Sequence, residues 1–318
     1  MSVMVRLSST PRRVFSVSSI AGSWVDVSLW RAQSPDQGSD CRLLLNNTWR
    51  LQLDKKIRDQ RQSGRSSEGP VGTALAADLS MVEAYDEGYY EDYHGPGRKG
   101  DDVSTRPLLA LLRRRVSEGR LLEVGCGYGH FLRHAARTYD TYGMDISSYA
   151  VQRAAIVTPE SELAVVDVES AKAVRGFVGE VRFEIIVALN VLEHLNSPFS
   201  VLEHLHSLLV PGGYLFFKVP KGNALVRRWY ALWGREHEWQ GLKDPTHVSL
   251  LPTEEWIGFL DRIGFDHEEL PTVPTGKIKR WFANSPALHR FYFMPWLPFV
   301  KWINEGLTVL CRKVESSS

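Results

Sequence analysis

The chain has 318 residues, of which 43% are hydrophobic and 24% are charged, and its formal net charge is +1 at pH 7. This composition is typical of a folded globular protein with one sizeable α/β core or two smaller domains. The near-neutral charge gives no overall field that would attract nucleic acid, so we expect no nucleic-acid partner.

The N-terminal stretch, residues 1–80, shows no sustained hydrophobic period, and we predict that it is mostly disordered. Three explanations of it stay open. Residues 1–30 are rich in Arg and Ser, as in an organellar transit peptide. The second explanation is a flexible extension of the folded domain. The third is that the stretch is absent from the natural product because translation begins at Met81. We favour the start at Met81, which makes 81–318 the folded domain.

From residue 106 onward, short β-rich runs alternate with amphipathic stretches, as in βαβ units with a parallel sheet. Helices are predicted at 106–116, 130–137, 198–209 and 253–263, the last with Thr253 as its N-cap. No run of about 18 apolar residues indicates a spanning helix. The sequence thus predicts an α/β fold with seven strands, at 120–125, 141–145, 163–168, 183–190, 214–220, 266–270 and 307–313.

The first predicted strand ends in a glycine-rich turn, LLEVGCGYGHFL, in which Gly125, Gly127 and Gly129 follow Glu123. Alternate glycines allow a tight turn and close approach of the backbone to a ligand, and free amides at a helix start favour an anionic group. A dinucleotide fingerprint would need its third glycine where His130 stands. The turn indicates a nucleotide-like ligand other than NAD, although tight packing of the strand against the helix also explains one or two of the glycines.

This turn resembles motif I of class I S-adenosylmethionine-dependent methyltransferases, particularly the small-molecule group similar to quinone-biosynthesis methyltransferases. The resemblance covers roughly residues 83–313 and implies a seven-stranded Rossmann-like sheet with helices on both faces. The last strand is expected to run antiparallel beside the fifth. The implied cofactor is S-adenosyl-L-methionine, and the implied reaction is methyl transfer to oxygen, nitrogen or carbon of an aromatic, lipid-like or sugar-derived small molecule.

The resemblance also implies a set of cofactor-binding residues. Asp145 ends the second strand, where a carboxylate can accept both ribose hydroxyls, although Asp145 and Ser147 are also suited to capping the next helix. Asp167 would bind the adenine amino group, or else be a solvated loop residue. Asn190 follows the fourth strand, near the methionine end. The full set is Glu123, Gly125, Cys126, Gly127, Gly129, Asp145, Ile146, Asp167, Val168 and Asn190.

Two histidines are candidate catalytic bases. Methyl transfer from a sulfonium needs alignment in a water-poor cavity above all, and a base helps only when the acceptor must lose a proton. His194 lies just beyond the fourth strand, at the carboxyl edge where open α/β sheets bind ligands. His247 lies in DPTHVSLLPTEEW, a segment that resembles the family's stretch before its penultimate helix. A structural, hydrogen-bonded role is the alternative for each.

Other segments are candidates for covering the substrate. The opening YDEGYYEDYHG resembles the family's N-terminal cap, so Tyr89, Tyr90 and Tyr93 are lid candidates, or else the buried face of an amphipathic helix. Two insertions near 223–240 and 276–303 mix aromatic and basic residues. They would line an acceptor pocket or rest peripherally on a membrane. We favour a packed helical cap with a mostly apolar pocket.

The three cysteines, Cys41, Cys126 and Cys311, have no paired spacing. We therefore expect no disulfide framework, no structural metal and a cytoplasmic location, unless residues 1–30 direct the chain to an organelle. Two rival functions remain, a nicotinamide-dependent oxidoreductase and a catalytically silent binding protein with a methyltransferase fold. Nothing in the sequence decides the oligomeric state.

Overall fold

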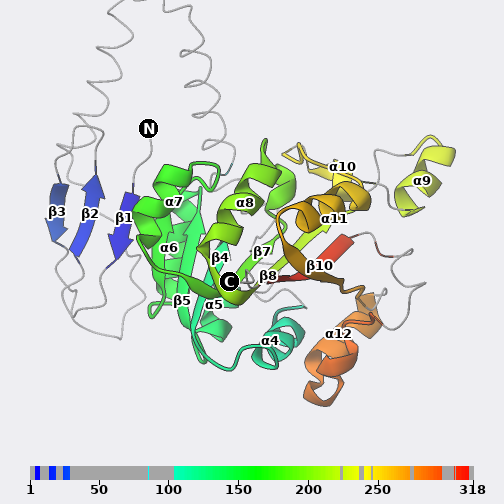
Figure 1. Ribbon diagram of the computed structural model, residues 1–318, viewed down its shortest axis with the longest axis horizontal. Helices are drawn as coiled ribbons and strands as arrows, with labels where there is room; N and C mark the ends of the chain where they lie inside the picture. The colour runs from blue at the N-terminus through cyan, green and yellow to red at the C-terminus, as the bar shows by residue number, and fades with distance from the viewer. Residues whose placement is uncertain are drawn as a thin grey trace, which may run out of the picture.

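The fold is built on a single mixed sheet with helices on both faces (Figure 1). The computed structural model describes residues 4–7, 14–18, 24–28, 85, 104–222, 225–235, 240–244, 246–272, 276–295, 304 and 306–314. The seven strands of this sheet are β4 (Arg120–Val124), β5 (Asp140–Asp145), β6 (Glu162–Val165), β7 (Phe183–Leu189), β8 (Leu209–Pro220), β9 (Phe265–Glu269) and β10 (Gly306–Lys313).

The strands lie in the order β6-β5-β4-β7-β8-β10-β9. The pairs from β6 to β8 are parallel, whereas β10 is antiparallel to both β8 and β9. This confirms the predicted fold class, including the antiparallel return of the last strand. The chain turns to opposite sides of β4 on forming β5 and β7, so their carboxyl ends flank a crevice of the kind that binds ligands in open α/β sheets.

The helices of the domain follow the predicted alternation with small shifts of their ends. Thr253 is itself the first helical residue of its helix, so the predicted N-cap was wrong: Pro252, with an extended ψ of 152°, holds that position. The helices are α4 (Thr105–Arg113), α5 (His130–Ala135), α6 (Ser148–Val157), α7 (Ala171–Val178), α8 (Pro198–Leu208), α9 (Leu225–Leu232), α10 (Gln240–Lys243), α11 (Thr253–Arg262) and α12 (Gly276–Asn284), with short 3-10 turns η1 (Leu192–His194) and η3 (Pro286–Phe291).

Two hydrophobic clusters form the core, one on each face of the sheet. Along β4, Leu122 and Val124 belong to one cluster and Leu121 to the other, as strand alternation requires. The first cluster includes Trp256 of α11, which is completely buried. The second includes α4, α5 and residues of the later insertion, among them Ala283 and Phe293. This arrangement fixes the strand ends from which the site is built.

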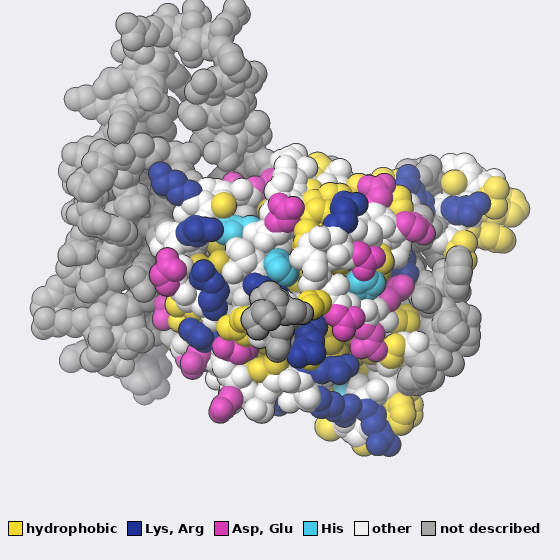
Figure 2. All heavy atoms as spheres, viewed as in Figure 1, with side chains coloured by type: hydrophobic (Ala, Val, Ile, Leu, Met, Phe, Trp, Pro, Cys, Tyr) yellow, Lys and Arg dark blue, Asp and Glu magenta, His cyan; other side chains and the backbone are white. Residues whose placement is uncertain are grey.

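The two insertions differ in how they meet the domain. The second contributes Ala283, Tyr292 and Phe293 to the core beside α4. The first forms α9, whose Trp229 is 62% exposed, followed by Trp233, which is 68% exposed. Figure 2 shows hydrophobic side chains gathered at the right edge of the molecule, where α9 lies in Figure 1. Within the described residues, no helix is long and apolar enough to cross a bilayer.

Three short strands lie in the N-terminal stretch: β1 (Met4–Leu7), β2 (Val14–Ser18) and β3 (Trp24–Ser28). They pair antiparallel in a separate small sheet. Most of residues 1–80, together with Tyr89, Tyr90 and Tyr93, lies outside the described residues. The domain boundary at residue 81 and the three lid tyrosines therefore stay predictions.

Candidate active site

The glycine turn after β4 is held in a shape that only glycine adopts readily. Gly125, Gly127 and Gly129 have φ angles of 67°, 49° and 75°, all in the left-handed region. A Cβ on Gly125 would lie 2.3 Å from Cγ2 of Val191, which follows β7. The turn and the chain after β7 therefore touch, with no space for a side chain between them.

Asp145 ties this turn to the end of β5. Its carboxylate accepts hydrogen bonds from the backbone N–H of Gly127 at 2.8 Å and of Ser147 at 2.9 Å. The cap of α6 is supplied by Ser147, whose hydroxyl oxygen accepts from the N–H of Ala150 at 3.3 Å. Each carboxylate oxygen can accept a second hydrogen bond. Asp145 is thus fixed at the carboxyl end of β5, beside the glycine turn.

Glu123, the acidic residue of the turn, has a buried carboxylate. Its side chain lies on β4 beside the crevice and is 4% exposed. No described residue hydrogen-bonds to its Oε2 atom. Burial, and then repulsion from Asp145, raises the pKa of this carboxyl well above its usual range. A buried acceptor without a donor is costly, and a ligand ammonium group would satisfy it.

The remaining predicted cofactor residues lie in the turns that follow β4, β5 and β6. The side chain of Cys126 packs in the core, and its amide donates to the carbonyl of Met144 at 3.1 Å, so it shapes the turn. Asp167 accepts from the N–H of Glu169 at 2.9 Å, which makes it a turn residue as well. Ile146 and Val168 follow β5 and β6, which are adjacent parallel strands. The assignment of these residues to the adenine end stays a prediction.

At the end of β7 the chain turns sharply. Asn190 has a φ of 54°, a left-handed angle that non-glycine residues rarely adopt, and its N–H donates to the carbonyl of Lys218. The following turn η1 presents Glu193 and His194. The Glu193 side chain is 1% exposed, and neither of its carboxylate oxygens has a hydrogen-bond partner among the described residues.

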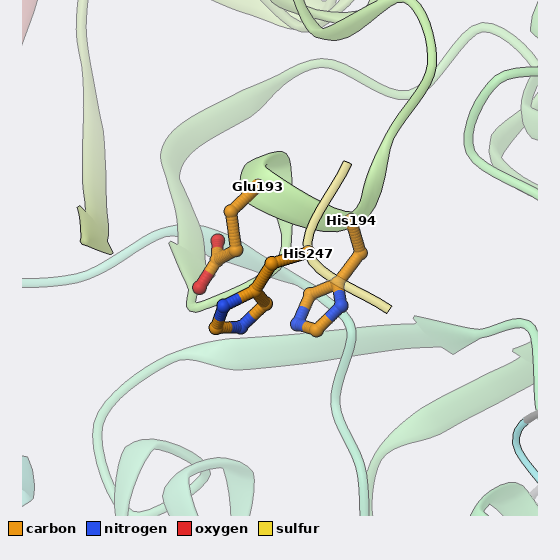
Figure 3. Close-up of side chains that lie close together, drawn as sticks. All are labelled: Glu193, His194 and His247. Atoms are coloured by element: carbon orange, nitrogen blue, oxygen red, sulfur yellow. The ribbon is translucent and has the colours of Figure 1, made fainter. Parts of the chain in front are cut away.

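The segment before α11 brings the second predicted histidine to the first. The carbonyl of Glu193 accepts hydrogen bonds from the N–H groups of Val248 and Ser249, at 3.0 and 2.8 Å. The rings of His194 and His247 then lie edge to face, with centroids 4.6 Å apart. Figure 3 shows the two imidazoles and the Glu193 carboxylate directed toward one another. The structure thus joins the two histidines that the sequence indicated separately.

Hydrogen bonds fix the orientation of both rings. His194 Nδ1 lies 2.8 Å from the Thr246 hydroxyl oxygen, and that hydroxyl donates to Asp244 at 2.5 Å. His247 Nδ1 lies 2.7 Å from the carbonyl oxygen of Gly241. Both partners act as acceptors, so each neutral ring carries its hydrogen on Nδ1 and leaves the Nε2 lone pair available.

The burial of this cluster shifts its ionisation strongly. Burial raises the pKa of Glu193 to about 8. Burial, and then repulsion from His247, lowers the pKa of His194 to about 4. Burial also acts on Asp244, but hydrogen bonds from Thr246 and attraction to both histidines outweigh it and lower its pKa. At neutral pH His194 is therefore an uncharged acceptor.

Tyr85 adds a group that the sequence reasoning missed. Its ring lies edge-on to His194 with centroids 5.9 Å apart, and its carbonyl accepts a hydrogen bond from the Ser147 hydroxyl at 2.7 Å. Burial is the main cause that raises the pKa of its hydroxyl to about 12. The sequence predicts a lid in the segment YDEGYY, but through its later tyrosines rather than its first. Tyr85 thus lies against His194 of the cluster, and a lid role for it stays a prediction.

A comparison of the whole chain with known families identifies its class. A family model described as a methyltransferase domain matches residues 99–270. The chain belongs to this methyltransferase family. The match includes strands β4 to β9 and the site residues that lie between them in the chain. It confirms that the chain is a class I S-adenosylmethionine-dependent methyltransferase and not the nicotinamide-dependent oxidoreductase considered as an alternative.

Two relatives show how far the similarity of this methyltransferase extends. A ubiquinone biosynthesis O-methyltransferase from Paraburkholderia phymatum is 28% identical over 171 residues, which are 52% of this chain and 72% of that enzyme. The hybrid PKS-NRPs synthetase opdA from Penicillium oxalicum is 27% identical over 188 residues, 56% of this chain. The methyltransferase matches only 5% of the length of that synthetase.

Solved structures support the same architecture. The plantazolicin methyltransferase BamL, in complex with a triazolic desmethylPZN analog and SAH, has a TM-score of 0.51 and 16% sequence identity. The alignment covers 75% of this chain and 97% of BamL. At this identity the likeness shows the fold alone.

Proposed function

We propose that this methyltransferase transfers the methyl group of S-adenosylmethionine to an oxygen atom of a small-molecule acceptor. The observation that carries the proposal is the pair of acidic residues at the ends of the adjacent strands β4 and β5, Glu123 and Asp145, on either side of the glycine turn. No described residue donates a hydrogen bond to Oε2 of Glu123, and the ammonium group of the cofactor would supply one. In this proposal the Asp145 carboxylate accepts the ribose hydroxyls of the cofactor.

The chemistry of the proposed reaction divides between the cofactor and the chain. When bound, S-adenosylmethionine supplies an electrophilic methyl group, so that an O–C bond forms as the C–S bond breaks and its electron pair stays on sulfur. The chain aligns the acceptor and excludes water. Glu193, His194 and His247 present lone pairs at the crevice, and a hydroxyl hydrogen is the natural partner for them. The hydroxyl proton leaves toward this cluster.

The acceptor atom is the finer part of the proposal. The two acceptor nitrogens, Nε2 of His194 and Nε2 of His247, suit an O–H group better than a carbon acceptor. The relatives named ubiquinone biosynthesis O-methyltransferases favour the same atom. We propose that Tyr85 and the aromatic residues of α9 border the acceptor, with a mostly apolar pocket. The buried free thiols of Cys126 and Cys311 suit a reducing compartment and hence the cytoplasm.

Calorimetric titration of the full chain with S-adenosylhomocysteine tests the cofactor site. Asp145→Ala should weaken binding roughly 10- to 150-fold, because hydrogen bonds to a charged group contribute about 1.5–3 kcal/mol each. Asp140→Ala is the matched control, since Asp140 lies at the other, exposed end of the same strand. Equal affinity of both variants, or no binding by folded wild-type protein, would contradict the proposal. Transfer of a labelled methyl group to a panel of phenols and alcohols then separates an enzyme from a silent binding protein.

A further inference from the structure

One atom from each of three side chains meets at the carboxyl edge of the sheet. The ligand atoms of Glu193, His194 and His247 all lie within 4.8 Å of one another (Figure 3). Around an octahedral or tetrahedral ion with ligands at about 2.0–2.2 Å, adjacent ligand atoms lie roughly 3–4 Å apart. A small movement of the three side chains toward one another would therefore bring their atoms to coordination distance. Glu193 and His194 are consecutive, but His247 lies far along the chain from them, so the sequence shows no metal-ligand spacing.

The Glu193 carboxylate requires a partner that the described residues do not provide. Both oxygens are buried and lack a hydrogen-bond donor, and they face the two imidazoles. Each imidazole already donates its N–H to another acceptor, so neither ring donates to the carboxylate in its neutral form. With no cation bound, the buried carboxylate must instead hold a proton, and a cation in place of that proton would satisfy the carboxylate and both ring lone pairs.

The surroundings of the two rings are those of metal-binding histidines. Such histidines donate the second ring N–H to a carboxylate or carbonyl, which fixes the tautomer and increases the basicity of the ligand nitrogen. His247 Nδ1 does so to the Gly241 carbonyl, and His194 Nδ1 does so to Thr246, whose hydroxyl is held in turn by Asp244. The Oδ2 atom of Asp244 lies 3.9 Å from His247 Nε2 and adds negative charge.

We infer that Glu193, His194 and His247 form a binding site for a divalent transition-metal ion. Two imidazoles and one carboxylate suit Zn²⁺, Co²⁺, Mn²⁺ or Fe²⁺, whereas Mg²⁺ and Ca²⁺ prefer all-oxygen sites. Three protein ligands leave positions open. Resting on the function proposed above, the inference assigns one open position to the acceptor hydroxyl oxygen. Coordination lowers the pKa of that hydroxyl. Because the ion occupies the three lone pairs of the cluster, the proton then passes to solvent instead of to the cluster, and the oxygen is held for methyl transfer.

The test is a titration of chelator-treated full-length protein with Co²⁺, followed by its visible d–d absorption. We expect one saturable site, with affinity reduced at least 100-fold in Glu193→Gln. His267→Gln is the matched control, because His267 also contacts a carboxylate, at 2.9 Å, but on the surface at Asp261. Thr246→Val removes the hydroxyl that links His194 to Asp244 but none of the three ligands, and should weaken Co²⁺ binding by about 10- to 100-fold.

The same samples separate this inference from the proposed function. S-adenosylhomocysteine binding should be unchanged in Glu193→Gln and weakened in Asp145→Ala, whereas Co²⁺ binding should be weakened in Glu193→Gln and unchanged in Asp145→Ala. Unfolding curves confirm that each variant is folded. An absence of saturable Co²⁺ binding by the wild-type protein, or equal binding by Glu193→Gln, overturns the metal site and leaves the cofactor site untouched.

Discussion

The contact between the glycine turn and the chain after β7 makes Gly125→Ala the most informative single change. The new Cβ would lie 2.3 Å from Val191 Cγ2, well inside the about 3.5–4.0 Å at which carbon atoms attract. Overpacking of this kind costs about 1–3 kcal/mol. The φ of 67° adds about 1–2 kcal/mol for an L-residue in the left-handed region. We expect Gly125→Ala to lower the free energy of unfolding by about 2–5 kcal/mol.

Urea unfolding of the wild type, Gly125→Ala, Val191→Ala and the double variant separates the steric contribution from the backbone contribution. In a Val191→Ala background the steric part disappears, so Gly125→Ala should cost only about 1–2 kcal/mol there. Gly264→Ala supplies a matched control, because Gly264 has a φ of 83° but no described atom within 4 Å of the position that a Cβ would take. If Gly125→Ala costs the same in both backgrounds, the close packing of the two segments is not what requires glycine.

Three further changes test the packing around the sheet, each by urea unfolding. Lys221→Met removes the 2.8 Å ion pair with Glu269, whose side chain is 17% exposed, and should lower the free energy of unfolding by about 2–3 kcal/mol. Adding Glu269→Gln should restore part of this stability, and no recovery in the double variant would contradict the pairing. Asn304→Ala removes three hydrogen bonds to Thr272 and should cost about 2–4 kcal/mol, so a loss below about 1 kcal/mol would refute that expectation. Trp256→Ala should lower the free energy of unfolding by about 3–5 kcal/mol. Trp256→Phe should lower it far less, because the buried indole N–H has no partner among the described residues, and equal losses in the two variants would contradict this.

The sequence predicts those parts of the site that depend on neighbouring residues. The glycine turn and Asp145 can be located because a strand end, a left-handed turn and a carboxylate leave a short, regular pattern. The expectation of Thr253 as an N-cap was wrong because hydroxyl residues are good caps in general, whereas here Pro252 already holds the extended position. Local patterns therefore indicate element types more reliably than their ends.

The acceptor side depends on contacts between distant segments, which no local pattern records. His194 and His247 are each candidates from the sequence, but their 4.6 Å approach results from the hydrogen bonds of Val248 and Ser249 to Glu193. Glu193 itself does not stand out in the sequence, because a carboxylate on a short turn is usually solvated. Only its burial in the folded chain distinguishes it. For the same reason Tyr85 does not stand out within the segment that is predicted to form a lid.

The placement of β10 between β8 and β9 has a consequence for synthesis of the protein. β10 pairs with β8 from Gly306 to Arg312 and with β9 from Val309 to Lys313, so it alone joins β9 to the rest of the sheet in the described part of the chain. It also leaves the ribosome after every other strand of that sheet. Until then, the edge of β8 is unpaired and open to association with other nascent chains. Completion of the sheet, and protection from aggregation, must therefore follow translation of residues 306–313.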